Sequence, residues 1–114
     1  MIQGIGCDIL EIKRFEKTFQ TFPSMLNKIF SKNEIEEYHK RNNDIRYLAS
    51  RFCAKESIVK SLKEYNYNLN TIEILNDDNN VPFVKFLKGP NHKVLISISY
   101  EKEYVISYAT LLCI

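Results

Sequence analysis

The sequence predicts an α+β domain in which an antiparallel sheet packs on one long helix. Three observations lead to this fold class. Apolar residues recur at helical spacing over residues 11–65, segments rich in β-branched and aromatic residues follow, and clusters of Asn, Asp, Gly and Pro separate those segments. With 114 residues, 45% of them hydrophobic, the chain is predicted to form one domain over residues 1–114.

The N-terminal part of the chain predicts one strand and two helices. Residues 1–9 alternate apolar and small side chains, as a short strand does. Residues 11–20 then show helical spacing, and Pro23 is expected to end that helix. The pattern Ser-x-x-Glu at residues 31–34 is a capping box, which predicts a second helix that runs to about Lys40.

The longest helical pattern spans residues 44–65. Leu48, Phe52, Val59 and Leu62 share one narrow face of this predicted helix, so the face must pack on another element. Four antiparallel strands are predicted after it, at residues 69–75, 82–87, 94–100 and 104–112.

Composition excludes several function classes. The formal net charge of +2 lacks the strong basic excess of a protein that coats nucleic acid, and no apolar run reaches membrane-spanning length. The N-terminus does not resemble a signal peptide, so we expect a soluble cytoplasmic protein. Cys7, Cys53 and Cys113 are interpreted as reduced core thiols, and His39 and His92 as solvated surface residues.

Five charged residues are candidates for chemistry. Asp8 stands inside an otherwise apolar strand, where an unpartnered carboxylate is costly to bury, and Glu56 and Lys60 lie one helical turn apart. Arg51 and Lys55 lie at the edge and in the middle of the long helix's apolar face.

Each candidate also has an ordinary structural explanation. Asp8 fits the exposed end of a strand or a cap on the following helix. Glu56 and Lys60 fit a surface ion pair, and Lys55 fits a side chain whose ammonium reaches solvent. In combination, however, two carboxylates and several cations suit Mg²⁺ and a phosphate-containing substrate.

Three motifs resemble those of the holo-acyl-carrier-protein synthases, the small bacterial type of phosphopantetheinyl transferase. The family's opening is similar to residues 4–15, Gly-Ile-Gly-Cys-Asp-Ile-Leu-Glu-Ile-Lys-Arg-Phe. Its helical signature is similar to residues 51–56, Arg-Phe-Cys-Ala-Lys-Glu, together with Lys60. Its closing hairpin is similar to residues 96–101, Ile-Ser-Ile-Ser-Tyr-Glu, and the segment after it.

The resemblance implies a reaction and an assembly. The implied enzyme transfers 4′-phosphopantetheine from coenzyme A to a serine of apo acyl carrier protein, releases adenosine 3′,5′-bisphosphate, and acts in fatty acid biosynthesis. It uses Mg²⁺, or Mn²⁺ as an alternative, held by Asp8 and Glu56. The resemblance further implies homotrimers with active sites between neighbouring subunits. The low net charge and the lack of a long apolar run predict no nucleic-acid or membrane partner.

The resemblance also assigns roles to individual residues. Catalytic roles are implied for Asp8, Glu56 and Lys60, and carrier-protein contacts for Lys13, Arg14 and Lys17 on the first helix. The implied coenzyme A contacts are Arg51, Lys55, Lys60, Pro82, Ser99 and Tyr100.

The chain departs from the family pattern at two places. Tyr100 stands where the family commonly has histidine, and a tyrosine carries no positive charge at neutral pH. Residues 63–68 replace a glycine-containing turn. Two other function classes stay open: a degenerate member that binds coenzyme A or carrier protein without transfer, and a small oligomerisation or nucleic-acid-binding module.

Overall fold

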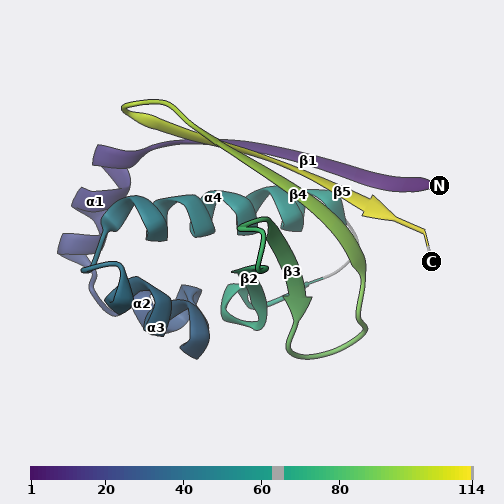
Figure 1. The fold of residues 1–114 in the computed structure, drawn as a ribbon, viewed down its shortest axis with the longest axis horizontal. Helices are drawn as coiled ribbons and strands as arrows, with labels where there is room; N and C mark the ends of the chain where they lie inside the picture. The colour runs from purple at the N-terminus through teal and green to yellow at the C-terminus, as the bar shows by residue number, and fades with distance from the viewer. Residues whose placement is uncertain (63–65, 114) are drawn as a thin grey trace.

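The structure is a computed structural model that describes residues 1–62 and 66–113 (Figure 1). Its elements in chain order are β1 (Ile2–Glu11), α1 (Ile12–Thr21), α2 (Met25–Ile29), α3 (Lys32–Lys40), α4 (Ile45–Leu62), the 3₁₀ turn η1 (Leu69–Thr71), β2 (Ile72–Asn76), β3 (Pro82–Phe86), β4 (Lys93–Tyr100) and β5 (Tyr104–Leu112). The end of the predicted long helix and part of the predicted turn fall on residues 63–65, which lie outside the described residues.

The described strands form two antiparallel sheets, so the prediction of a single sheet is wrong. One sheet has the order β1-β5-β4, and β2 pairs only with β3. The helix α4 runs along the three-stranded sheet and also packs on β2 (Figure 1). The predicted strand at residues 69–75 begins late, because Leu69–Thr71 form the 3₁₀ turn η1.

The contact between β1 and α4 depends on small residues. Gly4 and Gly6 are buried on the strand face that meets α4, and a side chain at either position would overlap the helix backbone. Ser57 and Ser61 on α4 face them, and each serine hydroxyl donates to a carbonyl three residues earlier in the helix. The strand and the helix therefore approach at backbone level.

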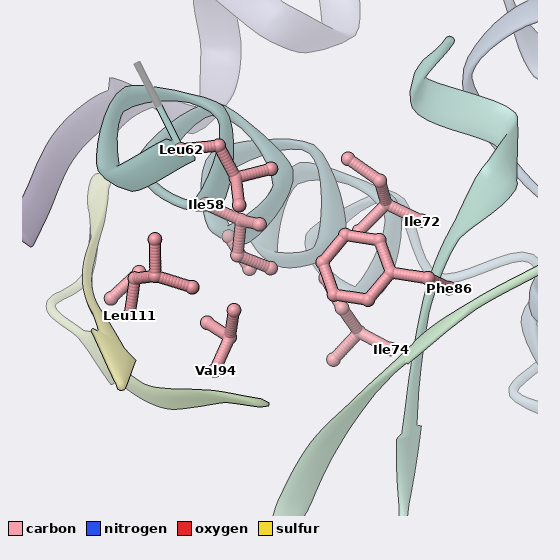
Figure 2. Close-up of a cluster of buried hydrophobic side chains, with 9 residues drawn as sticks. Ile58, Leu62, Ile72, Ile74, Phe86, Val94 and Leu111 are labelled. Atoms are coloured by element: carbon pink, nitrogen blue, oxygen red, sulfur yellow. The ribbon is translucent and has the colours of Figure 1, made fainter. Parts of the chain in front are cut away.

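The main hydrophobic core lies between α4 and both sheets. Ile58 and Leu62 of α4 point between Val94 and Leu111 of the three-stranded sheet and the side chains of β2 and β3 (Figure 2). The buried members of this core are Ala54, Ile58, Leu62, Ile72, Ile74, Phe86, Val94, Ala109 and Leu111. Burying each large aliphatic side chain stabilises the fold by about 1.5–3 kcal/mol.

The helices before α4 form a second core at the other end of the molecule. Ile12 and Phe15 of α1 pack there with Phe30 and with Tyr47 and Leu48 of α4. Helix α3 begins with the predicted capping box, in which the Ser31 and Glu34 side chains bind each other's backbone N–H groups. The short helix α2 was not predicted from the sequence.

The three cysteines are not alike, and the prediction that all are core thiols is wrong for two of them. Only Cys53 is buried, while Cys7 and Cys113 are exposed. His39 is exposed, as predicted, whereas His92 is half-buried and contacts the Tyr67 hydroxyl at 2.9 Å. None of the described helices is long and apolar enough to cross a membrane.

Candidate active site

Three predicted residues meet where β1 crosses α4. Asp8 follows Gly6 on the strand face that meets the helix, and its carboxylate oxygen Oδ1 accepts a hydrogen bond from Lys60 Nζ at 3.1 Å. Lys60 Nζ also donates to the Cys7 carbonyl at 2.9 Å. Glu56 lies one turn before Lys60 on the same helix. The fold therefore brings these residues together, although they come from elements about 50 residues apart.

The charges of this group influence one another. Partial burial and the negative charge of Asp8 raise the pKa of Glu56, and Lys60 counteracts that rise. The hydrogen bond to Asp8 raises the pKa of Lys60, so the ammonium form is favoured. Two carboxylates that repel each other in a half-buried site are stabilised by any cation between them.

The donor set suits magnesium. Among the described residues there is no cluster of three or more His, Cys, Asp or Glu side chains, so the protein itself offers the two carboxylates of Asp8 and Glu56. Mg²⁺ prefers oxygen ligands, keeps several waters, and is commonly bound through one or two carboxylates plus substrate phosphates. Burial first and the charge of Asp8 second raise the pKa of Glu56, and a divalent cation beside the two carboxylates would favour their charged forms.

Arg51 lines a pocket on another side of α4 from Glu56 and Lys60. This pocket has a volume of about 340 Å³ and is lined by Glu37, Arg41, Tyr47, Arg51, Leu75, Asn76 and Asn80. The guanidinium groups of Arg41 and Arg51 lie 4.7 and 4.8 Å from the centre of the Tyr47 ring. Arg51 Nη2 donates to the side chain of Asn76, whose strand partner is the predicted contact Pro82.

Two polar groups beside this pocket are buried. The Arg51 Nε and the Tyr47 hydroxyl are both closed off from solvent, and burial raises the pKa of Tyr47 while the adjacent Arg51 counteracts that rise. A ligand in the pocket therefore cannot reach either atom as the side chains stand, and the charge that lines the pocket comes from the guanidinium groups of Arg41 and Arg51 and the carboxylate of Glu37. Sequence analysis found Arg51 and Pro82 but missed Arg41, Tyr47 and Asn76, which show no pattern along the chain.

Ser99 and Tyr100 lie apart from both groups, at the end of β4. Both side chains are exposed. The Arg46 guanidinium lies 5.8 Å from the centre of the Tyr100 ring and donates to the Lys102 carbonyl at 3.3 Å. A positive charge therefore lies beside Tyr100, even though the tyrosine itself is neutral.

Lys55 does not belong to this surface, and its predicted contact with coenzyme A conflicts with its position. The side chain is fully buried, with Nζ bound to Glu34 Oε1 at 2.6 Å and to the carbonyls of Ile29 and Leu69. Three oxygens saturate the three donors of an ammonium group. A phosphate cannot reach this nitrogen, so Lys55 has a structural role. The alternative prediction, a side chain whose ammonium reaches solvent, is also wrong.

The basic residues predicted on the first helix share an exposed surface. Lys13, Arg14 and Lys17 are all exposed on α1, whereas Ile12 and Phe15 face the core. Helix α1 follows β1 directly, so this surface begins a few residues after Asp8.

Comparisons with known proteins agree with this arrangement. Residues 4–109 match the family model of the 4′-phosphopantetheinyl transferase superfamily (ACPS). A holo-[acyl-carrier-protein] synthase of Thermodesulfovibrio yellowstonii is 36% identical over 97% of this chain and 99% of its own length. One from Fusobacterium nucleatum is 38% identical over 98% of this chain and its full length.

A solved structure shows the same fold. The holo-(acyl-carrier-protein) synthase of Bacillus anthracis, crystallised in complex with CoA (3′,5′-ADP), superposes with a TM-score of 0.82 at 32% identity, over 97% of this chain and 96% of that one. The fold and the sequence together define a transferase of the phosphopantetheinyl class. This chain belongs to the 4′-phosphopantetheinyl transferase superfamily.

Proposed function

We propose that this chain is a holo-acyl-carrier-protein synthase, which transfers 4′-phosphopantetheine from coenzyme A to a serine of apo acyl carrier protein. The observation that carries the proposal is the meeting of Asp8, Glu56 and Lys60 where β1 crosses α4, in a member of this superfamily. Adenosine 3′,5′-bisphosphate is the other product. We assign the reaction to fatty acid biosynthesis in the cytoplasm.

In this proposal Asp8 and Glu56 hold Mg²⁺, or Mn²⁺ in its place. The bound ion supplies positive charge that offsets the charge of the pyrophosphate. Lys60 places an ammonium beside the same phosphates, and the proton of the attacking serine passes to a nearby carboxylate or to water at the site. The serine oxygen forms the new bond to the β-phosphorus as the bond to the nucleotide oxygen breaks.

The pocket of Arg51 is proposed to receive the nucleotide end of coenzyme A. Arg51 supplies positive charge that suits a phosphate, while Arg41 on the same pocket is ion-paired with Glu37 at 2.9 Å. Pro82 is not part of the pocket lining, but it pairs with Asn76, which is.

Lys13, Arg14 and Lys17 are proposed to bind the carrier protein. They form an exposed basic surface on α1, close along the chain to Asp8. Such a surface attracts an acidic partner, and the attraction weakens as salt increases.

We propose that the chain forms homotrimers through the outer face of the three-stranded sheet. This face carries large apolar side chains that are 43–64% exposed, namely Ile5, Ile9, Leu95, Ile106 and Tyr108. A sheet face this apolar is typical of an interface between protein chains. The trimer would bring Ser99 and Tyr100 of one subunit to the active site of its neighbour.

Intact mass spectrometry of a carrier protein tests the reaction. Apo acyl carrier protein is incubated with coenzyme A and the purified chain, with Mg²⁺ or with a chelator. We expect a Mg²⁺-dependent mass gain of one phosphopantetheine, lost in Glu56→Gln. Glu36→Gln, the same chemical change on the exposed side of α3, serves as the matched control and should keep the gain.

Two results would contradict the proposal in different ways. Equal Mg²⁺-dependent transfer by Glu56→Gln and the unchanged chain would reject the metal ligands but keep the reaction. No transfer to several carrier proteins, despite calorimetric binding of coenzyme A, would identify a binding protein without transferase activity.

A further inference from the structure

Lys60 already occupies the carboxylate that is proposed to hold a metal ion. Its Nζ lies 3.1 Å from Asp8 Oδ1 and 2.9 Å from the Cys7 carbonyl. A divalent cation on Asp8 and the ammonium of Lys60 therefore compete for the same carboxylate, because two cations beside one carboxylate repel each other.

The surroundings allow the ammonium to leave. The Lys60 side chain is 54% exposed, whereas the Asp8 side chain is only 18% exposed. An ion pair with one solvated partner contributes little to stability, because water replaces the contact when the pair separates. The contrast with Lys55 is clear, since the Lys55–Glu34 pair has no exposure on either side and is held by further backbone bonds.

We propose that Lys60 is a displaceable internal counter-ion: its ammonium neutralises Asp8 in the metal-free protein and is released toward the substrate phosphates when a divalent cation binds. The inference rests on the proposed function, because it concerns the same two carboxylates. It assigns Lys60 a role before the substrate arrives, in addition to its contact with phosphate.

The proposal predicts coupling between the metal and the substrate. Metal binding releases the ammonium from Asp8, and the four-carbon stem of lysine lets it turn while remaining at the site. A released ammonium favours phosphate binding, and by reciprocity phosphate that holds Lys60 away from Asp8 favours the metal. Lys60 therefore lowers metal affinity in the absence of coenzyme A.

Manganese binding without coenzyme A tests the inference directly. Mn²⁺ titrations followed by electron paramagnetic resonance report the free ion and need no turnover. We expect Lys60→Met to bind Mn²⁺ roughly two- to fivefold more tightly than the unchanged chain. This range corresponds to the free energy of a weak, exposed ion pair that the metal no longer has to break. Lys60→Arg, which keeps the charge, should remain near the original affinity.

The control separates local competition from net charge. Lys40→Met removes one exposed positive charge from α3, which lies on a different element from both Asp8 and Lys60, and should leave Mn²⁺ affinity unchanged. Far-ultraviolet circular dichroism and thermal unfolding confirm that the variants compared are folded.

The possible outcomes distinguish this inference from the proposed function. Equal or weaker Mn²⁺ binding by Lys60→Met than by the unchanged chain overturns the counter-ion role and leaves the metal site intact. An equal gain in Lys60→Met and Lys40→Met also overturns it, because the effect would then be one of net charge. Absence of Mn²⁺ binding in every variant rejects the proposed metal site itself, and the counter-ion role with it.

Discussion

Gly6 and Ser57 touch at backbone level: a Cβ added to Gly6 would lie 1.9 Å from the Ser57 carbonyl oxygen. Asp8 is the next residue on the same face of β1, and Glu56 immediately precedes Ser57 on α4. The missing side chain at Gly6 therefore lets the strand approach the helix closely enough to bring the two carboxylates together.

Gly6→Ala tests this close approach. Because the obstructing atom is backbone rather than a flexible side chain, the helix and the strand must separate, and we expect unfolding free energy to fall by about 1–3 kcal/mol or more. Mn²⁺ affinity should fall as well. Urea unfolding measures the first effect. Cys7→Ala, whose side chain points to the opposite face of β1, is the control, and equal stability of the two variants would contradict the prediction.

The buried pair of Lys55 and Glu34 is expected to be a strong determinant of stability. Lys55→Met leaves the Glu34 carboxylate buried without its cation, which should lower unfolding free energy by about 3–5 kcal/mol. Adding Glu34→Gln should restore part of this loss, since the uncompensated charge is removed. A double-mutant cycle measured by urea unfolding checks both. A loss below about 1 kcal/mol for Lys55→Met would contradict this account.

Thiol alkylation tests the trimer interface. Burial raises the pKa of Cys53 to about 12, so this thiol should react with iodoacetamide at neutral pH only after unfolding. Cys7 lies on the outer face of the sheet, so trimer formation should protect it, whereas Cys113 should react readily. Peptide mass spectrometry at several protein concentrations follows each site. Equal labelling of Cys7 and Cys113 in a sample that sediments as a trimer would place the interface elsewhere.

Arg51→Met should weaken coenzyme A binding selectively. Loss of a charge-assisted hydrogen bond of about 1.5–3 kcal/mol corresponds to a rise in KM for coenzyme A of roughly 10–150-fold. Arg14→Met, on the basic surface of α1, should instead raise KM for the carrier protein. Steady-state kinetics with each substrate varied in turn distinguishes them. If both variants changed the same KM, one of the two surface assignments would be wrong.

Local signals in the sequence predicted most of the secondary structure. Helix α3 was found from its capping box, and β4 and β5 from their β-branched residues. Helix α2 was missed because five residues after Pro23 give no periodic pattern. The division into two sheets was also missed, since alternation along one strand carries no information about which strand pairs with it.

The errors at individual residues have the same physical origin. The position of Lys55 on the apolar face was visible in the sequence, but its partner Glu34 was recognised only as a helix cap. Cys7 was taken for a core residue because its neighbours Ile5 and Ile9 are apolar, yet all three lie on the outer face of β1. When the outer face of a strand is also apolar, the sequence does not indicate which face of the strand packs against the rest of the protein.

The pairing of β1 with β5 places a constraint on synthesis of the protein. Asp8 lies opposite Ser107 in this pairing, and the Met1 carbonyl accepts a hydrogen bond from the Cys113 N–H, so the two ends of the described chain lie side by side (Figure 1). Because β5 occupies the centre of its sheet, β1 has no strand to pair with until β5 has left the ribosome. A nascent chain that lacks β5 therefore cannot assemble the site around Asp8, and contacts this distant in sequence also favour slow folding.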